Sequence, residues 1–406
     1  MILLLCQREY RILVESIASD LKTTFNDHVE VELAFADDDK LWDREANWDD
    51  LLVAFFDERN FPGPGNNLIK DYLQERSGKG LLLPVALKSG HTRPPTQATK
   101  IKAFPFDSGT PEIQSRLVRR IGAMIGLRAQ QRDNVIFISY RATDGKEIAV
   151  QLEQHLESLG YPVWRDEAKE LDGETKILPG TEVQDQIDDA LAKSSIMLLL
   201  DTPESPHSPW ITHEVETANS LLLPILPLCF RPPIDNKQGP RFPSLRQRQR
   251  WLNLPLLAGI TPPLQNEQLA GVANQMEDYL CELIQRKCRV PFLVEKEFIK
   301  RNFSWHMLDQ KLLIGKSVKG ADTRFPIKVL SHCSIFDHVH IPGMKAFSAF
   351  INKVGHPNFS LYIYDGEIIP EPQLKRIIED NPTIDSIYTL HHQELAALIE
   401  SNFAMK

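Results

Sequence analysis

The segment from Ser208 to Glu214 (Ser-Pro-Trp-Ile-Thr-His-Glu) carries two side chains that could do chemistry together. Ser208 suits the N-cap position of a helix, and Pro209 suits the first helical position. In a helix that begins there, Trp210 and Glu214 lie one turn apart on the same face, because residues four apart are neighbours. A carboxylate beside a large aromatic ring can bind the edge of a sugar. The alternative is an ordinary helix, with Trp210 in the core and Glu214 in solvent.

The expected place of this helix in the fold supports a binding role. The helix follows a continuous apolar run, 196–200, which is typical of a buried strand. In doubly wound folds, ligands bind in the crevice outside the carboxyl ends of the strands. Tyr140 and Arg141 come just after the apolar run 135–138, so we expect them to line the crevice at the same edge. The alternative is that they are ordinary loop residues.

Residues 131–290 alternate between short apolar runs and amphipathic segments with helical spacing. Strands that are apolar on both faces and separated by helices are typical of a parallel sheet covered on both sides. We therefore predict an α/β domain with a doubly wound, flavodoxin-like parallel sheet. The expected strands are 135–138, 161–164, 196–200 and 221–228, and the expected helices are 145–159 (capped by Asp144), 183–191, one from about 209, and about 266–287.

Residues 1–130 show the same alternation in a weaker form. The expected strands are 2–6, 29–35, 51–56 and 81–85. The run 81–85 (Leu-Leu-Leu-Pro-Val) resembles the run 221–225 (Leu-Leu-Leu-Pro-Ile) almost letter for letter. We interpret residues 1–130 as a degenerate copy of the domain predicted for 131–290. Two unrelated α/β domains are the alternative.

Residues 291–406 form a third predicted unit, also of the α/β class. The expected helices are 347–354, 374–378 and 395–403, and the expected strands are 359–364 and 387–390. This unit carries no motif that indicates a specific chemistry. A role in sensing or in assembly is the expectation that remains for it.

Composition and charge exclude several classes of protein. The chain has 406 residues, enough for about two or three domains. Its net charge of −9 at pH 7 argues against direct binding of nucleic acid, because such proteins usually carry a basic patch. No apolar run reaches the roughly 18 residues that a membrane-spanning helix needs. The five scattered cysteines include no Cys-x-x-Cys pair, so we expect reduced thiols and a cytoplasmic protein.

The histidines of the C-terminal region are the strongest candidates for a metal site. His332-Cys333 and the pair His338 and His340 are residue types that zinc prefers. No second pair follows at ligand spacing, so we interpret them as solvated side chains and predict no metal. Neither a Gly-x-x-x-x-Gly-Lys-Ser/Thr loop nor a Gly-x-Gly-x-x-Gly fingerprint occurs, and we predict no bound cofactor.

Several short motifs follow one another in a characteristic order through residues 131–290. They are Phe137-Ile138-Ser139-Tyr140-Arg141, Asp144, Gly160, Val163, Asp166, Ser194-Ser195, and Ser208-Pro209-Trp210 with Glu214. In order and spacing this set resembles a Toll/interleukin-1 receptor (TIR) domain. By that resemblance, the segment 165–180 corresponds to the so-called BB loop. Ile211 stands where the family commonly has cysteine.

The resemblance implies an activity. Many bacterial and some eukaryotic TIR domains cleave NAD⁺ at the nicotinamide–ribose bond, using the glutamate that corresponds to Glu214. Nicotinamide departs as a neutral molecule and needs no general acid, so the species to be stabilised is an oxocarbenium-like ribose. A carboxylate can hold the ribose hydroxyls and stabilise that cation. The residues then expected to bind the substrate are Tyr140, Arg141, Trp164, Ser208 and Trp210, although Trp164 is also a candidate for a buried strand aromatic.

By the same resemblance, the chain is an NAD⁺ glycohydrolase of a bacterial antiphage or immune defence system, with NAD⁺ as its substrate. Self-association through TIR domains, and an activating partner protein or signal ligand, are expected to make the site competent. A non-enzymatic TIR adaptor and a cyclase that makes a cyclic ADP-ribose-type signal are the alternatives. Between Phe56 and Leu81 the N-terminal copy lacks a Ser-x-Trp-x-x-x-Glu pattern, so we expect that copy to be catalytically silent.

Overall fold

The computed structural model describes most of residues 1–300 and five strands of the remainder. The positions outside the description are 26, 28, 39–50, 58–60, 62, 75–80, 89–102, 107–108, 131–134, 167–182, 222, 236–237, 246–249, 258, 301–302, 310–311, 318–323 and, after 329, all except 361–364, 379, 388–391, 394 and 397. The chain divides into two compact units, one made of residues 1–217 and 225–282 and the other of residues 218–224 and 283–406.

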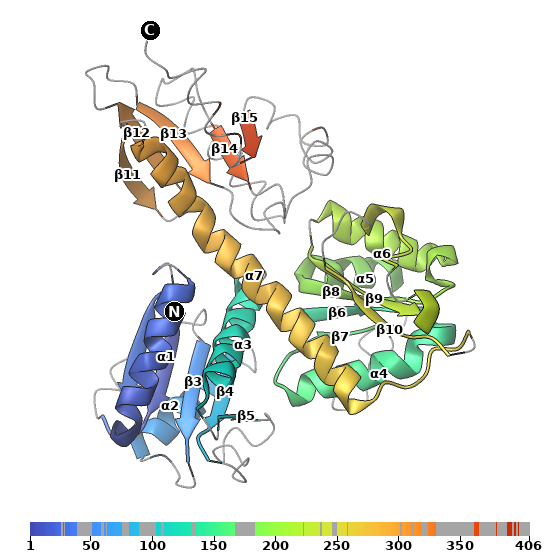
Figure 1. The fold of residues 1–406 in the computed structure, drawn as a ribbon, viewed down its shortest axis with the longest axis horizontal. Helices are drawn as coiled ribbons and strands as arrows, with labels where there is room; N and C mark the ends of the chain where they lie inside the picture. Colours follow the sequence, from blue (N-terminus) through green and yellow to red (C-terminus); the bar gives the residue numbers. More distant parts are fainter. Residues whose placement is uncertain are drawn as a thin grey trace. The chain divides into compact units, whose positions relative to one another are not determined.

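The first sheet is parallel and has the strand order β2-β1-β3-β4-β5. Every residue of β1 and β3 is buried, as expected for runs that are apolar on both faces. Its strands are β1 (Ile2–Cys6), β2 (Val31–Phe35), β3 (Leu51–Phe56), β4 (Leu81–Ala86) and β5 (Phe104–Pro105), and its helices are α1 (Arg11–Thr24), α2 (Gly63–Gln74) and α3 (Pro111–Gln130) (Figure 1).

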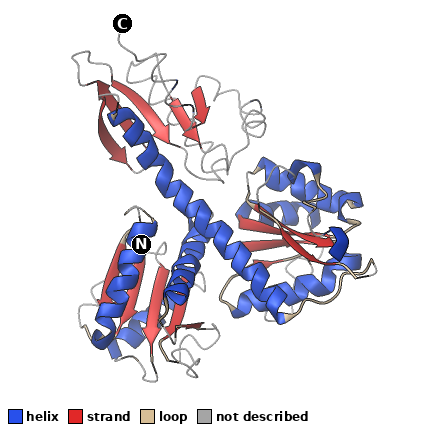
Figure 2. Ribbon diagram, in the orientation of Figure 1, coloured by secondary structure: helices blue, strands red, loops and turns tan. Residues whose placement is uncertain are grey.

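The second sheet is also parallel, with the order β7-β6-β8-β9-β10. Its strands are β6 (Val135–Ser139), β7 (Val163–Trp164), β8 (Ser194–Asp201), β9 (Ile225–Arg231) and β10 (Leu252–Pro255), and its helices are α4 (Ala142–Ser158), α5 (Val183–Lys193), α6 (Pro209–Ser220) and α7 (Asn266–Ile299). Helices α5 and α6 lie on one side of the sheet and α4 on the other (Figure 1). The strands form the inner layer between helices (Figure 2). The prediction of a doubly wound parallel sheet is confirmed.

The two parallel sheets share their strand order. Counted along the chain, each has the flavodoxin-like order 2-1-3-4-5. In the first sheet Leu5 lies in one row with Ala54 and Pro84. In the second sheet Ser139 lies in one row with Leu199 and Pro227.

The strand bounds limit the sequence match between 81–85 and 221–225. All five residues of the first run lie in β4, whereas only Ile225 of the second run belongs to β9. Strand β9 begins only at Ile225, although 221–228 was expected. The backbone N–H of Leu223 donates to the carbonyl of Ala218, and Pro224 has no N–H. Leu223 is therefore bonded to the end of α6 and lies ahead of the strand.

Two helices of the second sheet differ from their expected bounds. The N-cap of α4 is Arg141 and not Asp144, which lies in the first turn. Helix α7 continues to Ile299, well past the expected end at 287. A proline in a helix removes one N–H donor, and the turns on both sides of Pro291 nevertheless remain helical. The predicted domain division at 130 coincides with the end of α3, whereas the division at 290 falls inside α7.

The third sheet is mixed, with the order β11-β12-β13-β14-β15. Its first three strands pair antiparallel, and β13, β14 and β15 pair parallel. The strands are β11 (Phe303–Asp309), β12 (Leu312–Ser317), β13 (Arg324–Val329), β14 (Leu361–Tyr364) and β15 (Tyr388–His391). The last two lie where strands were predicted, and the first three were not predicted. The helices expected at 347–354, 374–378 and 395–403 lie outside the described residues.

Helix α3 joins the first two sheets, because it contacts elements of both. Gln114 at its start donates a hydrogen bond of 2.7 Å to Asp20 of α1. Near its end, the carbonyl of Leu127 accepts a 2.8 Å bond from the hydroxyl of Ser195 in β8. A Cβ at Gly126 would lie 2.8 Å from the carbonyl oxygen of Leu280 in α7. Helix α3 is therefore part of the packing of the second sheet.

Candidate active site

Ser139 and Glu214 meet at the carboxyl edge of the second sheet. Ser139 is the last residue of β6, and Glu214 lies in the second turn of α6. The Ser139 hydroxyl donates a hydrogen bond of 2.5 Å to Oε2 of Glu214. Glu214 is only 6% exposed and Ser139 1%. The alternative of a solvated Glu214 is therefore wrong, and the carboxylate points to the end of the central strand β6.

The start of α6 places Glu214 at this edge. Pro209 is the first residue of the helix, and the N–H of Ile211 donates to Oγ of Ser208 at 3.5 Å, as expected for a serine N-cap. The preceding loop is held by Ser205, whose hydroxyl donates to the carbonyl of Leu200 at 2.9 Å. The Ser205 oxygen also accepts a bond from the N–H of Thr202 at 3.1 Å. These bonds fix where the helix begins relative to β8.

Burial changes the protonation of Glu214. Burial raises the pKa of this carboxyl group to about 8, because the charged form loses contact with water. The hydrogen bond from Ser139 acts in the opposite direction, since it stabilises the ionised form. The negative charges of Asp166 and Asp188 raise the pKa further. Glu214 is thus a carboxyl group that ionises close to neutral pH and becomes easier to ionise when a cation binds beside it.

Trp210 lies one helical turn before Glu214, and its surroundings are the opposite of those of the carboxylate. Its side chain is 56% exposed, so the interpretation of Trp210 as a core residue is wrong. Trp210 is the second residue of α6. Its Cα lies about 6 Å along the helix axis from that of Glu214, at a rise of 1.5 Å per residue. The edge therefore presents an open indole ring next to a buried carboxylate.

A family model described as a TIR domain matches residues 136–255. The match runs from β6 to β10 and therefore spans the whole second sheet. The middle of this chain is a TIR domain. A search of curated proteins found no match for the chain.

Two residues that follow Ser139 in the TIR domain were predicted to line the site. Tyr140 is buried, and its side chain lies close enough to Arg165 to affect the pKa of the guanidinium. Arg141 is the N-cap of α4, and its guanidinium lies 3.5 Å from a carboxylate oxygen of Asp144. Gly145 allows α4 to pack closely against Tyr140, since a Cβ added at Gly145 would lie 3.1 Å from Cβ of Tyr140. Of the two, Arg141 has the more exposed side chain.

The segment that leads into the BB loop of the TIR domain is described only as far as Asp166. The half-buried Trp164 stacks on Phe137 of β6, with ring centroids 4.7 Å apart and planes inclined by 19°. This stacking contact agrees with the interpretation of Trp164 as an aromatic residue that packs within the sheet. Asp166 follows two residues later and lies close enough to Glu214 to affect its charge. The remainder of the predicted BB loop, 167–182, lies outside the described residues.

Sequence reasoning did not assign Ser139, Asp166 and Asp188 of the TIR domain to the site. Ser139 was recognised only as part of a motif, because a serine at the end of a strand has many uses. Asp188 of α5 contacts the ring of His213, the residue before Glu214, with Nε2 at 3.0 and 3.3 Å from its two carboxylate oxygens. The helical spacing of α5 gives a surface residue at 188, and only the fold brings it next to α6.

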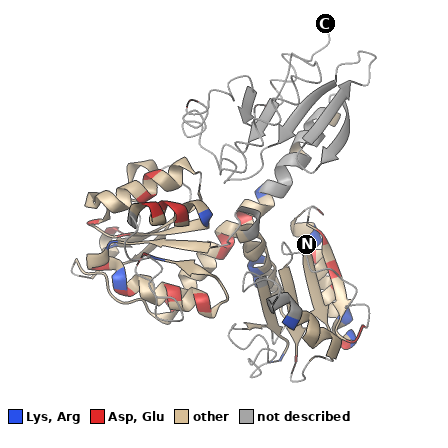
Figure 3. Cartoon of the chain, turned by 180° about the vertical axis from the view of Figure 1, so that it is seen from behind, with Lys and Arg blue, Asp and Glu red and all other residues tan. Residues whose placement is uncertain are grey.

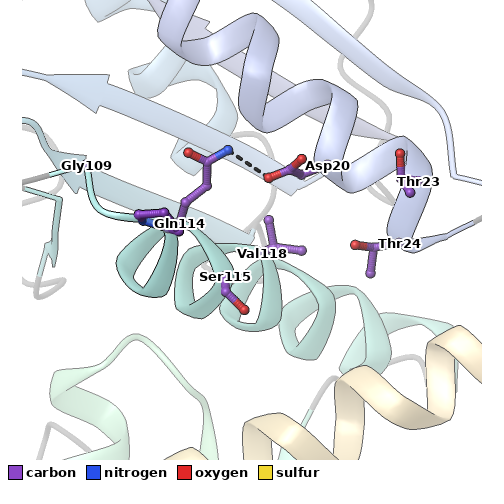
Figure 4. A pocket seen from close by; sticks show the side chains of 8 residues that line it. Asp20, Thr23, Thr24, Gly109, Gln114, Ser115 and Val118 are labelled. Carbon is purple, nitrogen blue, oxygen red and sulfur yellow. Dashed lines mark hydrogen bonds between the residues drawn. The ribbon is translucent and has the colours of Figure 1, made fainter.

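The other candidate sites lie elsewhere. The histidines 332, 338 and 340 lie outside the described residues. Within the described part, no three His, Cys, Asp or Glu side chains gather as a metal site would require. A pocket of about 350 Å³ lies between α1 and α3 of the first sheet (Figure 4), where Asp20, Gln114 and Val118 are among the lining residues. It contains none of the residues predicted to do chemistry. None of the described helices is long and apolar enough to cross a membrane.

Proposed function

We propose that this protein is an NAD⁺ glycohydrolase that cleaves the nicotinamide–ribose bond with Glu214 of its TIR domain. The observation that carries the proposal is the buried Glu214 carboxyl group, held by Ser139 at the carboxyl edge of the sheet and one turn from the exposed ring of Trp210. In doubly wound folds this edge is where ligands bind.

The chemistry of the reaction fits a single carboxylate. Bond cleavage leaves neutral nicotinamide and a ribose with oxocarbenium character, so stabilisation of a positive charge is the main requirement. A carboxylate in a water-poor setting stabilises such a cation far better than one in bulk water. Water then attacks the ribose to give ADP-ribose. Attack by the adenine part of the same molecule would instead give a cyclic product. The enzyme would then be a cyclase.

The acidic surroundings of Glu214 also suit the substrate. Asp166 and Asp188 both act on the charge of Glu214, and the helices around this sheet carry further acidic residues (Figure 3). The nicotinamide ring of NAD⁺ is a cation before cleavage. A cation that binds beside Glu214 favours its ionised form, so substrate binding and the formation of the active carboxylate support each other.

The first sheet is proposed to be a catalytically silent copy of the TIR fold. Leu5 of β1, the strand that has the place of β6 in the strand order, belongs to a buried apolar cluster with Phe61, Leu68 and Ile69. Leu68 and Ile69 lie in α2, the helix that follows β3 as α6 follows β8. Apolar side chains thus lie between this strand and α2, whereas the TIR domain holds its serine and glutamate between β6 and α6. A role in assembly is the proposal that remains for this region.

The biological setting is a proposal from the family. We place the protein in a bacterial antiphage or immune defence system, acting on cytoplasmic NAD⁺. Self-association of TIR domains, with a partner protein or a signal ligand as trigger, would keep the activity off until it is needed. The third sheet, as a sensor or assembly unit, is the candidate to receive that trigger.

The proposal is tested with the full chain and the Glu214→Gln variant. The protein is mixed with NAD⁺ at low concentration and under conditions that promote oligomers, and nicotinamide release is followed by chromatography. We expect the substitution to lower the rate by about 10²- to 10³-fold, the usual cost of removing one electrostatic stabiliser. Retained activity in the variant would place the chemistry elsewhere in the chain, including the first sheet.

A matched control is Glu216→Gln on the same helix. Glu216 is exposed and two residues further along α6, so its loss removes one charge without touching the buried site. We expect unchanged activity in this variant. A chain that assembles but releases no nicotinamide under any condition would instead be an adaptor.

A further inference from the structure

Strand β7, which leads into the predicted BB loop, is short. It contains only Val163 and Trp164, which pair with Ile136 and Phe137 of β6. Two backbone pairs hold a strand end weakly, because each hydrogen bond contributes only about 1 kcal/mol net. The position of Asp166, two residues beyond the strand, must therefore depend on side-chain contacts as well.

A buried ion pair supplies such a contact at the end of β7. Nε of Arg165 donates to Oε2 of Glu153 in α4 at 2.5 Å. Both side chains are only 10% exposed. Arg165 also interacts electrostatically with Tyr140, the residue that follows Ser139. The guanidinium therefore joins the root of the BB loop to α4, close to the end of β6.

This arrangement places the Arg165 guanidinium between the two sides of the site. Asp166 follows Arg165 directly in the chain, and Ser139 precedes Tyr140 directly. A buried guanidinium presents its donors in a fixed plane, so it orients its partners more strictly than a single flexible ammonium does. We infer that Arg165 is a positioning residue, whose buried ion pair with Glu153 fixes Asp166 beside Glu214. The consequence for catalysis rests on the function proposed above.

Displacement of Asp166 would have a specific electrostatic consequence. The charge of Asp166 is one of the causes that raise the pKa of Glu214, after burial itself and against the bond from Ser139. Asp188 acts in the same direction from α5, where it is bonded to His213. If Asp166 moves away, its contribution is lost and the pKa of Glu214 falls, whereas Asp188 and His213 stay in place on their own helices.

The test is the double variant Arg165→Met with Glu153→Gln in the full chain. Removal of both partners avoids a buried unpaired charge, which is the costly outcome of changing only one. We expect the midpoint of the pH dependence of kcat/KM for NAD⁺ to move to lower pH by roughly one unit, the size of a nearby charge effect. A midpoint at the wild-type pH would overturn the inference, because a merely structural role changes the amount of active protein and not its pH profile.

A second buried Arg–Glu pair at the other end of β7 provides the control. Arg120 of α3 pairs with Glu277 of α7, at 10% and 8% side-chain exposure, and Glu277 accepts a bond from Tyr161 just before the strand. The matched variant Arg120→Met with Glu277→Gln should lose a similar part of its stability and keep the wild-type midpoint. An equal shift in both variants would mean that general loosening of the domain moves the midpoint, and the inference would fail.

A readout without turnover separates this inference from the proposed function. In each background, Glu214→Gln is added and the difference in Tm is recorded against pH, which reports the titration of Glu214 alone. A shift of this curve in the Arg165/Glu153 background supports the positioning role even if no nicotinamide is released. Arg165→Lys, with Glu153 kept, retains the charge but not the planar guanidinium, so its midpoint should lie between those of the wild type and the double variant.

Discussion

The hydroxyl of Ser139 and the carboxylate of Glu214 form a 2.5 Å hydrogen bond that joins the last residue of β6 to the second turn of α6. The bond crosses from the central strand to a helix whose start is fixed by Ser208 and Pro209. It orients the carboxylate, and it offsets part of the cost of burying a charged group. The same bond therefore affects both the position of the negative charge and the pH at which Glu214 ionises.

Substitution of Ser139 by alanine should move the pH dependence of the enzyme upward. The hydroxyl stabilises ionised Glu214, so its loss raises the pKa of that group above its present value of about 8. At pH 7 a smaller fraction of the enzyme then carries the active carboxylate. We expect kcat/KM for NAD⁺ at pH 7 to fall by roughly 10-fold, the equivalent of one charge-assisted hydrogen bond. The measurement is the initial rate of nicotinamide release between pH 6 and 10.

Ser195→Ala is the control for this variant. Ser195 is also fully buried in the TIR domain, but it lies at the start of β8 and donates to the carbonyl of Leu127. Loss of its bond should lower stability without moving the pH profile. If Ser139→Ala also leaves the profile in place, the hydroxyl has no part in setting the charge of Glu214.

The stability of the protein should depend on pH through Glu214. The pKa of this group is about 8 in the folded protein and about 4.3 in an unfolded chain, so the folded state binds the proton more tightly. Its contribution is fully present below about pH 4, decreases as the pH rises toward 8, and is lost above that value. Glu214→Gln removes the dependence. In urea unfolding, the free energy of unfolding of the variant should exceed that of the wild type by on the order of a few kcal/mol at pH 9 but not at pH 5. The same difference between the two proteins at both pH values would contradict the raised pKa.

The fold of the two parallel sheets could be predicted because their core strands are apolar on both faces. Alternation of such runs with amphipathic helices leaves few other arrangements. Strand bounds were harder to predict. The leucine-rich runs 81–85 and 221–225 look alike, yet the first lies wholly in β4 and only Ile225 of the second belongs to β9. In the third sheet, β11 to β13 were missed because polar and apolar residues mix in these antiparallel strands, which gives a weaker signal.

The site was predictable at Glu214 and less so around it. The Ser-Pro-Trp start of α6 gives both a cap and a spacing, and the structure places the carboxyl group at the expected edge. The partners Ser139, Asp166 and Asp188 come from three other elements, separated from Glu214 by 26 to 75 residues. Nothing in the local pattern of a strand end or a helix surface indicates which buried group it will meet.

Trp210 is expected to contribute to substrate binding and not to the fold. Its ring is 56% exposed, so Trp210→Ala should leave Tm nearly unchanged. Stacking of a ring or base on an aromatic side chain contributes about 1–3 kcal/mol, and we expect KM for NAD⁺ to rise by about 10-fold with little change in kcat. Trp210→Phe should recover most of the affinity. A variant with normal KM that no longer forms oligomers in light scattering would assign the ring to assembly instead.

The close contact between α3 and α7 should make Gly126 intolerant of any side chain. An added Cβ would lie 2.8 Å from the carbonyl oxygen of Leu280 and 3.3 Å from its Cβ, and a backbone atom in a helix cannot move aside alone. Gly126→Ala should therefore separate the two helices slightly and cost about 1–3 kcal/mol, as overpacking does. Gly271→Ala is the matched control, because Gly271 lies in α7 with no atom within 4 Å of the new Cβ, and alanine favours a helix by up to about 1 kcal/mol. Opposite signs of the two changes in urea unfolding would establish that the helix before β6 packs on the TIR domain in solution, whereas a neutral Gly126→Ala would mean that this contact is absent.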